Sequence, residues 1–485
     1  MSFDDLSGLM PMLLPAAGGV FILVMVALGL DRDLRWPAIY ATLFLLLSGM
    51  SAGSLLMRGY REELFEAAVL VDPRALAFHL VFVAAALLTV LSSATHLRAE
   101  GYGHGEFFAL IQFAVAGMSM MASSENLLTI FLGLEILSIS LYVLAGFTRD
   151  RVHAIEGALK YFLLGAFSTG FLLYGIALYY GASGRIDLPG IASHLASERG
   201  GPADPLVLAA AGLLLIGLAF KVAAVPFHFW APDVYQGSMA PVAGFMAAGT
   251  KAAAFAALLR VLDAALQGDP MRARFGAVLH AVALLTMVAG NVVALAQQNI
   301  KRMLAYSSIA NAGYLLVAVI AGGAVGQGSS IVLFYLAAYT FMTIGAFSVA
   351  ALVGRTGEDD QGYALSAYAG LSRRRPWLAA AMALFMLSLT GIPPTGGFMG
   401  KFYIFKAAVD AGQYDLAIVG LLASVISAFY YLRIVVQMYV RDPGPDAGPV
   451  ALLPSEALAI FAAAAATLWI GLFPSALLAL AQRLV

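Results

Sequence analysis

The chain has 485 residues, of which 61% are hydrophobic and only 11% are charged, and its formal net charge is -1. Ordinary soluble domains carry roughly 25% charged residues, so this composition indicates a polytopic membrane protein. The sequence contains no cysteine, which excludes disulfides, iron–sulfur clusters and thiolate metal sites. The near-neutral charge gives no indication of a nucleic-acid partner, and the acidic N-terminal stretch does not resemble a cleaved signal peptide.

Apolar runs long enough to cross a bilayer follow one another along the whole chain, and their lengths predict about fourteen helices. The connections between them are short, so no separate soluble domain is predicted. The predicted helices cover residues 9–30, 36–57, 75–96, 106–124, 126–147, 157–180, 205–225, 241–264, 276–297, 302–323, 329–353, 377–391 continued by 395–411, 414–440 and 453–480. The predicted fold class is therefore an all-α polytopic membrane protein.

The basic residues of the loops give a weak indication of orientation. Lys and Arg are spread almost evenly over the two sets of loops, but the basic stretch 372–377 and the acidic N-terminus favour the same arrangement. Because basic residues concentrate on the cytoplasmic side, both termini are expected to face the outside of the membrane.

Two of the predicted helices are interrupted by helix breakers. The stretch 217–241 carries three prolines, and the stretch 389–406 carries two adjacent prolines followed by two glycines. Proline removes a backbone donor and clashes with the preceding turn, so each helix is expected to open around its prolines. The interruptions lie near two lysines, Lys221 and Lys401, which are about five predicted helices apart.

This spacing predicts a five-helix unit that occurs twice with opposite orientation. The first inverted repeat covers residues 106–264 (helices 4–8), and the second covers residues 276–440 (helices 9–13). A three-helix segment, 1–105, precedes them, and the last helix lies in 441–485. Broken helices at corresponding positions of inverted repeats indicate an ion or substrate path near the middle of the membrane.

Charged residues inside the predicted spans are the main functional candidates. Each costs about 2.5–3.5 kcal/mol on insertion scales, and one glutamate cannot neutralise several lysines. Burial disfavours the charged form of an amine, so a lysine without a carboxylate partner exchanges its proton readily, as a proton carrier must. The candidate proton-transfer residues are Glu135, Lys160, Lys221, His228, Lys251 and Lys401.

Structural roles compete with this interpretation. Lys160 could reach out of the membrane from a helix end, and His228 could be an ordinary core histidine. Arg433 in the thirteenth helix could tie two helices together. Glu135 could form a static ion pair with a buried lysine such as Lys221; alternatively, it could hold that lysine protonated and release the proton when its own influence is withdrawn.

The stretches that carry these residues resemble the antiporter-like membrane subunits of bacterial NADH:quinone oxidoreductase, respiratory complex I. Together they make the resemblance specific, and it extends over nearly the whole chain. The resemblance is closest to the N-type subunits, because Lys401 is a glutamate in the M-type and the long lateral helix of the L-type is absent. It rests on residues 217–241 and on "GLEILSISLYVLAGF" (133–147), "EGALKYFLLGAFSTGFLLYGIALYYGASG" (156–184), "GTKAAAFAALLRV" (249–261), "NIKRMLAYSSIANAGYLL" (299–316) and "LTGIPPTGGFMGKFYIF" (389–405).

The resemblance implies fourteen helices, two inverted repeats and one proton channel. It implies a multi-pass protein of the bacterial inner membrane, with both termini on the periplasmic side, that holds no NADH, flavin, cluster or quinone. Its expected partners are a second antiporter-like subunit and small subunits with buried carboxylates. By resemblance, Glu135 is the functional glutamate, Lys160, Lys221 and Lys251 are the central lysines, Lys401 is the exit-side lysine, and His228 links the half-channels.

One position departs from the family pattern, and two other functions compete. Relatives often carry histidine where this chain has Asn311, which cannot carry a proton; a relay there would need water with Ser307, Ser308 or Tyr314. The first alternative function is a subunit of a cation/proton antiporter. A sodium ion would then need oxygen ligands beside Glu135, for which the sequence offers Thr129, Ser138 and Ser140. The second alternative is a purely structural membrane anchor.

Overall fold

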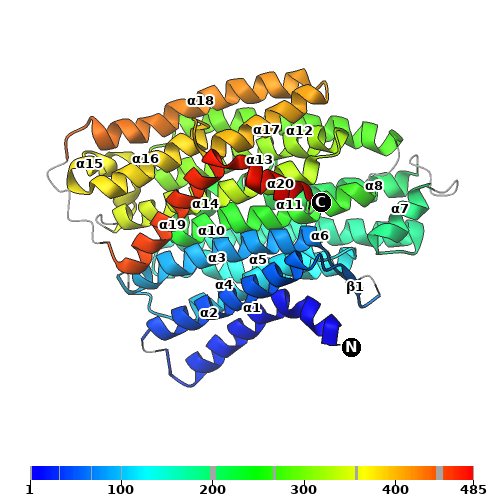
Figure 1. The fold of residues 1–485 in the computed structure, drawn as a ribbon, viewed down its shortest axis with the longest axis horizontal. Coiled ribbons are helices and arrows are strands. Elements are labelled where there is room, and N and C mark those ends of the chain that lie inside the picture. The colour runs from blue at the N-terminus through cyan, green and yellow to red at the C-terminus, as the bar shows by residue number, and fades with distance from the viewer. Residues whose placement is uncertain are drawn as a thin grey trace.

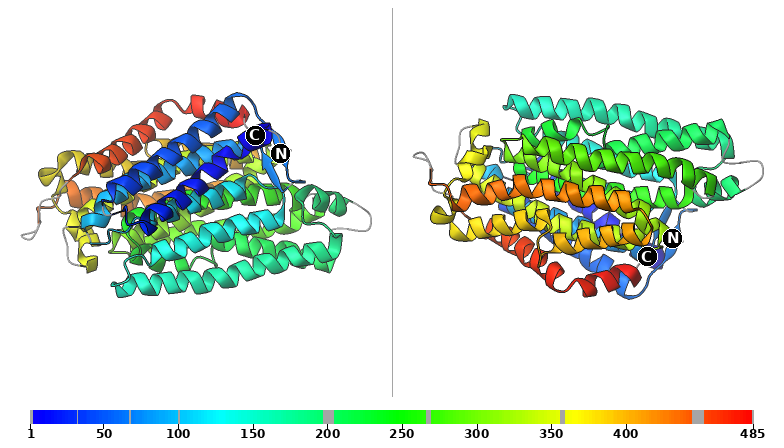
Figure 2. Two further views of the ribbon diagram at one scale, coloured as in Figure 1. Left: turned by 90° about the horizontal axis from the view of Figure 1, so that it is seen from below. Right: turned by 90° about the horizontal axis from the view of Figure 1, so that it is seen from above.

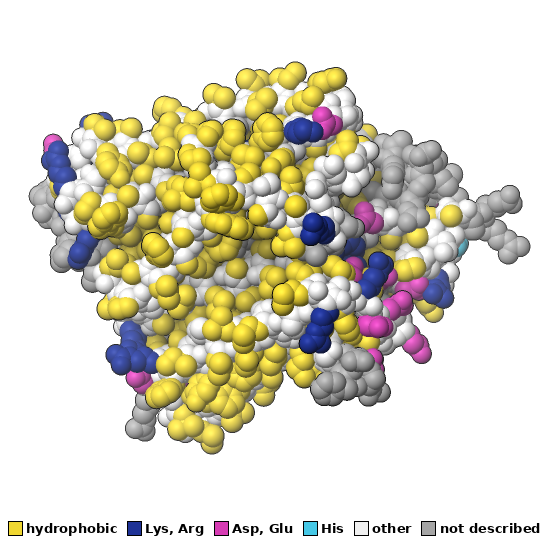
Figure 3. Space-filling model, in the orientation of Figure 1, with side chains coloured by type: hydrophobic (Ala, Val, Ile, Leu, Met, Phe, Trp, Pro, Cys, Tyr) yellow, Lys and Arg dark blue, Asp and Glu magenta, His cyan; other side chains and the backbone are white. Residues whose placement is uncertain are grey.

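The helices of the computed structural model lie side by side along the long axis of the molecule (Figure 1). On the face seen in Figure 3, hydrophobic side chains cover the middle, and charged side chains lie mainly toward the two ends. This is the distribution expected when the sides of a helix bundle face lipid. The structure describes residues 3–31, 33–66, 68–99, 101–196, 204–265, 269–355, 359–443 and 452–483.

The predicted all-α membrane architecture is confirmed. Within the described residues, twelve helical segments are long and apolar enough to cross a membrane, and α4 (Glu106–Ala122) and α16 (Pro376–Thr390) are shorter apolar helices. The twelve are α1 (Phe3–Ala27), α2 (Arg35–Met57), α3 (Pro73–Ala99), α5 (Leu127–Ala145), α6 (Val152–Ser183), α8 (Pro205–Val222), α10 (Ala240–Phe245) continued by α11 (Lys251–Ala265), α12 (Asp269–Leu295), α13 (Ile300–Ala324), α14 (Gly328–Gly354), α18 (Tyr414–Tyr439) and α19 (Pro454–Leu472).

Several short elements were not predicted. An antiparallel hairpin pairs Glu62 with Val71, and its strands are too short for a periodicity signal. The single last helix predicted over 453–480 is wrong, since α19 ends at Leu472 and a new helix starts at Pro474. The remaining elements are β1 (Glu62–Leu64), β2 (Val69–Val71), α7 (Leu188–Ala196), α9 (Trp230–Gly237), η2 (Asp359–Tyr363), η3 (Leu365–Tyr368), α15 (Leu371–Arg374), α17 (Gly396–Asp410) and α20 (Pro474–Arg483).

A chain of hydrogen bonds ties the first four helices together. In α1, Pro15 has no N–H to offer the carbonyl of Pro11 one turn earlier. The Ser48 hydroxyl of α2 donates to that carbonyl at 2.7 Å. The buried His79 ring of α3 then joins Ser48 and Ser119 of α4, each at 2.7 Å. With these contacts α1 and α2 form one flank of the bundle, and α18 forms the opposite one (Figures 1 and 2).

The first predicted helix break is present between α8 and α9. Ala223 has a left-handed backbone with φ of 58°, and residues 223–229 form an irregular segment around Pro226. The other two prolines do not open the helix, contrary to the prediction. Pro232 lies in the first turn of α9, and Pro241 lies at the start of α10, where the missing N–H would have no intrahelical partner.

The second predicted break separates α16 from α17. Gly391 ends α16 with φ of 94°, a conformation that favours glycine. A Cβ atom at this position would lie 3.1 Å from Cδ of Lys401, so glycine also makes room for that side chain. The adjacent prolines Pro393 and Pro394 follow, and α17 begins at Gly396.

The helix predicted over 241–264 is not regular throughout. Met246–Thr250 form a π-helical turn between α10 and α11, and Lys251 follows it directly. Such turns are rare and occur frequently at functional sites. Hydropathy gives no signal for them, because a π turn changes hydrogen bonding without changing composition.

Candidate functional site

Three of the four candidate lysines are almost completely buried, as is Lys301 at the start of α13. Lys221, Lys251 and Lys401 are 4%, 2% and 4% exposed. In the described part of the chain, the ion pairs involve other side chains, and none joins one of these three amines to a carboxylate. All three amines instead donate hydrogen bonds to neutral hydroxyl and carbonyl oxygens.

Lys221 lies in the last turn of α8, directly before the first break. Its amine donates to the Ser138 hydroxyl of α5 at 2.9 Å and to the Tyr161 hydroxyl of α6 at 3.2 Å. Glu135 lies one turn before Ser138 on α5, and its Oε1 atom is buried with no hydrogen-bond partner among the described residues. The described residues include no direct ion pair between Glu135 and Lys221, although both groups lie beside Ser138.

Lys251 is the first residue of α11 after the π-helical turn. Its amine donates to the backbone carbonyl of Ser308 on α13 and, at 2.7 Å, to the hydroxyl of the same residue. The hydrogen-bond partner of Lys251 is thus Ser308, whose hydroxyl is one of those that the sequence suggested near Asn311.

Lys401 lies in α17, and its amine hydrogen-bonds the backbone at the second break. Its amine donates to the carbonyls of Leu389 and Thr390 at 2.9 and 3.0 Å, and to the Ser424 hydroxyl of α18 at 3.0 Å. The amine also lies 4.9 Å from the ring centroid of Tyr314. The two carbonyls belong to the last turn of α16, where backbone acceptors lack intrahelical partners and the helix dipole is negative. The broken helix therefore supplies the acceptors for this lysine.

Lys160 differs from the three buried lysines. Its side chain is 41% exposed and forms ion pairs with Glu156 and Asp233, each at 2.6 Å. Asp233 also binds Arg302 at 2.5 Å. This arrangement agrees with a lysine that reaches out from a helix end, the structural alternative considered from the sequence.

His228 lies in the irregular segment of the first break. It is half-buried, its ring lies 4.5 Å from that of Phe229, and its Nδ1 atom is buried without a hydrogen-bond partner among the described residues. A cavity of about 350 Å³ lies beside the same break and is lined mainly by apolar side chains, including Phe167, Phe227 and Trp230. Among the described residues, His228 makes no hydrogen bond with any of the three buried candidate lysines.

Arg433 is a structural tie, as one alternative held. Its guanidinium donates to the carbonyls of Leu295, at 3.4 Å, and Gln297. These carbonyls lie at and just beyond the C-terminal end of α12, so Arg433 of α18 closes the end of a neighbouring helix.

A set of buried polar side chains joins the surroundings of Lys251 and Lys401, and the sequence identified it only in part. Ser307 and Asn311 are residues that the sequence pattern already suggested. The other four lie on other helices and meet them only in the folded chain. Their signal in the sequence is weak, since each is an isolated polar group in an apolar run. The set comprises Asn291, Ser307, Asn311, Tyr335, Tyr430 and Tyr431.

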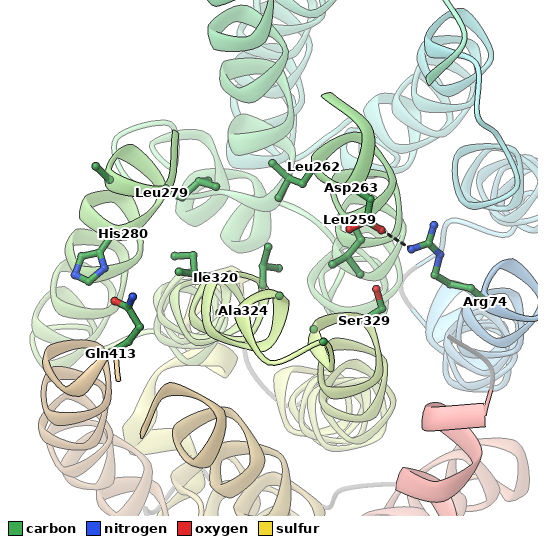
Figure 4. A pocket seen from close by; sticks show the side chains of 16 residues that line it. Arg74, Leu259, Leu262, Asp263, Leu279, His280, Ile320, Ala324, Ser329 and Gln413 are labelled. Atoms are coloured by element: carbon green, nitrogen blue, oxygen red, sulfur yellow. Dashed lines mark hydrogen bonds and ion pairs between the residues drawn. The ribbon is translucent and has the colours of Figure 1, made fainter. Parts of the chain in front are cut away.

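A larger cavity of about 900 Å³ lies beside the connection between α13 and α14 (Figure 4). Leu259, Leu262 and Ile320 line it, and the ion pair of Arg74 with Asp263, at 2.8 Å, lies at its edge (Figure 4). None of the six candidate residues lines this cavity.

Residues 124–427 match the family model described as NADH:quinone oxidoreductase/Mrp antiporter, TM. The chain belongs to this family. The match contains all six candidate residues, from Glu135 to Lys401. It leaves α1 to α4, α19 and α20 outside, so the candidate site lies in the part that is common to the family.

Curated relatives confirm the resemblance to the N-type subunits. The chain is 49% identical over 421 residues to NADH-quinone oxidoreductase subunit N of Trichlorobacter lovleyi, a match that covers 87% of this chain and 85% of the relative. It is 41% identical over 489 residues to NADH-quinone oxidoreductase subunit N 1 of Koribacter versatilis, with 99% and 95% covered.

Solved structures of membrane complexes have the same fold. A chain of respiratory complex I from Thermus thermophilus with bound Aureothin superimposes with a TM-score of 0.81 at 37% identity, covering 97% of this chain and 98% of that chain. A chain of the Mrp complex from Dietzia sp. gives a TM-score of 0.84 at 22% identity, covering 98% and 96%. The second similarity concerns the fold alone. Members of this antiporter-like family thus occur in multi-subunit membrane complexes.

Proposed function

We propose that the chain is a proton-translocating membrane subunit of an NADH:quinone oxidoreductase. The observation that carries the proposal is the burial of Lys221, Lys251 and Lys401, two of them at broken helices, with no ion pair to a carboxylate among the described residues. A buried ammonium without a counterion is costly, so small changes in its surroundings decide whether it holds its proton. The N-type names of the relatives support the choice of complex.

In this proposal the protons move along a buried axis of titratable groups. Glu135 and Lys221 respond to each other through the shared neighbour Ser138, and Lys251 and Lys401 continue the axis through the second half of the chain. Lys160 exchanges protons at the end of α6 with its carboxylate partners, and His228 links the two halves at the first break. The two five-helix units, 106–264 and 276–440, provide the two half-channels.

The driving energy comes from the rest of the complex. In the proposal, quinone reduction and all redox chemistry take place in other subunits, and this chain responds to changes of charge or conformation passed on by its neighbours. Moving one charge through the membrane potential costs about 2.3 kcal/mol per 100 mV. The chain lies in the bacterial inner membrane with both termini periplasmic, between a second antiporter-like subunit and small subunits with buried carboxylates.

The geometry favours proton transfer over a sodium site. The predicted sodium ligand Ser138 accepts a hydrogen bond from the Lys221 amine at 2.9 Å, and an ammonium at that distance repels a second cation. Ser138 and Ser140 also donate their hydroxyl protons to backbone carbonyls of α5. The cation/proton antiporter is therefore not favoured as a second function.

The test is NADH-driven proton uptake by proteoliposomes that contain the assembled complex. Lys221→Ala and Glu135→Ala should lower uptake by about tenfold or more, because a positioned proton-transfer group contributes at least this much. Lys406→Ala is the matched control, since Lys406 lies on the same helix as Lys401 but is exposed and paired with Asp410 at 2.5 Å. If Lys221→Ala and Glu135→Ala complexes assemble and pump at the wild-type rate, the chain is not a proton channel.

A further inference from the structure

The cavity of about 900 Å³ shown in Figure 4 lies at one end of the helix bundle. The helices α11 and α13 end beside it, and α12, α14 and α18 begin beside it. Because membrane helices end at the boundary of the hydrocarbon region, the cavity lies at the depth of the lipid headgroups. Tyr414, which is 60% exposed and follows the lining residue Gln413, is the kind of aromatic residue that marks this boundary.

Much of the cavity wall is formed by large apolar side chains from three helices. They are Leu259 and Leu262 of α11, Leu279 of α12, and Val319 and Ile320 of α13. Leu259 and Val319 are only 4% and 9% exposed, so this wall reaches below the surface of the bundle. An apolar wall with a few polar groups is typical of a site for an organic ligand.

Two pairs of basic and acidic side chains lie at opposite sides of the cavity. On one side, Arg74 forms an ion pair with Asp263 at 2.8 Å. On the other side, Nε2 of His280 lies 2.5 Å from Oδ2 of Asp415. Figure 4 shows Arg74 and Asp263 together and His280 across the cavity from them. Each side therefore combines a hydrogen-bond donor with a carboxylate.

In both pairs the carboxylate is the more exposed partner. The side chain of Asp263 is 61% exposed and that of Arg74 only 16%, while Asp415 is 58% and His280 24% exposed. The basic groups therefore lie deeper than the carboxylates. A phosphatidylethanolamine headgroup matches this order, because its phosphate lies next to the glycerol and its ammonium lies further out. A headgroup with negative charge alone would be repelled by both carboxylates.

The surface of α12 continues from the cavity toward the middle of the bilayer. Ala277 lines the cavity and is exposed, and Val288, which is 43% exposed, lies three turns further on nearly the same side of the helix. The two positions are about 17 Å apart along the helix axis, close to half of the roughly 30 Å hydrocarbon thickness. Leu285 and Val292 are exposed beside them. An acyl chain that leaves the cavity can therefore follow α12 through one leaflet.

We propose that this cavity binds one phosphatidylethanolamine molecule of the bilayer. Its phosphate accepts hydrogen bonds from Arg74 and His280. Its ammonium donates to Asp263 and Asp415, and its acyl chains cover the apolar wall and α12. A primary ammonium has three N–H donors for the carboxylates, which the trimethylammonium of phosphatidylcholine lacks. The inference does not depend on the proposed function, because none of the six candidate residues lines the cavity.

The test is photolabelling of the assembled complex in proteoliposomes with a phosphatidylethanolamine that carries a diazirine in its acyl chain. The readout is label on Leu259, which lines the cavity and is 4% exposed, so lipid on the outer surface does not reach it. Unlabelled phosphatidylethanolamine should compete for this label about tenfold better than phosphatidylcholine or phosphatidylglycerol, because it alone offers the carboxylates an ammonium donor. Equal competition by the three lipids, or no label on Leu259, would overturn the proposal.

Cavity-filling substitutions provide matched variants. Gly323 of α13 and Gly276 of α12 both line the cavity, and a Cβ atom at either position meets no atom within 4 Å. A Cβ atom at Gly170, on the exposed side of α6, is equally unobstructed. Gly323→Leu should remove most of the label on Leu259, whereas Gly170→Leu should leave it at the wild-type level. Gly276→Leu repeats the test if Gly323→Leu does not assemble, and wild-type labelling in either cavity-filling variant would overturn the proposal.

The choice of headgroup has a separate readout. Asp263→Asn removes a negative charge beside Arg74, so the preference for phosphatidylethanolamine over phosphatidylglycerol should fall by about tenfold. Asp187→Asn changes a similar pair, formed with Arg185 at 2.7 Å, that does not line the cavity, and it should leave the preference unchanged. Equal preferences in the two variants would overturn the headgroup assignment.

Discussion

Substitution of Lys401 by glutamine should separate its two roles. The amine holds the carbonyls of Leu389 and Thr390 at the end of α16, and it also binds Ser424. A glutamine amide can still donate two hydrogen bonds but cannot carry a proton. Lys401→Gln complexes should therefore assemble normally and lose proton uptake.

Lys401→Met removes both roles, and its cost can be worked out from the same contacts. The carbonyl of Leu389 loses its side-chain donor, which costs about 1–3 kcal/mol, whereas the carbonyl of Thr390 still accepts from the Ser424 hydroxyl at 3.1 Å. The removal of a buried charge partly offsets this cost.

The assay is heat-induced dissociation of the purified complex followed on native gels, together with proton uptake. Lys401→Met should dissociate at a lower temperature than Lys401→Gln, and both should fail to take up protons. If Lys401→Gln pumps at the wild-type rate, the lysine is only a structural tie, and if Lys401→Met is as heat-stable as wild type, the contacts at the break contribute nothing.

Three further outcomes follow from individual contacts. Ser48→Ala should destabilise the complex by about 1–3 kcal/mol because it leaves the carbonyl of Pro11 without a donor, and Pro15→Ala in the same chain should recover most of this loss by restoring a backbone N–H. Lys160→Gln should reduce proton uptake less than Lys221→Ala does, since its side chain is half-exposed and already paired. Glu135→Asp, which keeps the charge, should retain more uptake than Glu135→Gln.

Each of these has a clear contrary result. If Ser48→Ala lowers the dissociation temperature by the same amount with and without Pro15→Ala, the Ser48 hydroxyl does not replace the missing donor to the carbonyl of Pro11. Complete loss of proton uptake with Lys160→Gln would show that this lysine belongs to the buried axis. Equal uptake by Glu135→Asp and Glu135→Gln would show that the charge of the carboxylate is not needed.

The sequence was sufficient for features that depend on composition and local chemistry. Apolar run length predicted the membrane helices, and the prolines and glycines predicted the breaks around Pro226 and at Gly391–Thr395. Because charged residues are scarce in these runs, Lys221, Lys251 and Lys401 were identifiable as candidate proton-transfer residues. These features can be predicted from the sequence because each membrane span must form its own backbone hydrogen bonds and carries the energetic cost of its own charged side chains.

Features that depend on which helices meet could not be predicted. The acceptors of Lys401 come from the last turn of α16, and the partner of Lys251 is on α13, so neither follows from local spacing. Lys160 looked like the other lysines because its partner Asp233 lies far along the chain.

The most direct test of the central claim is proton uptake by the complex with a single change at Lys251. This amine is buried in the middle of the proposed axis and contacts only Ser308 among the hydrogen-bond partners described. Lys251→Gln should assemble and show roughly tenfold less NADH-driven proton uptake, while Lys406→Gln pumps as wild type does. Wild-type uptake with Lys251→Gln in a fully assembled complex would contradict the account.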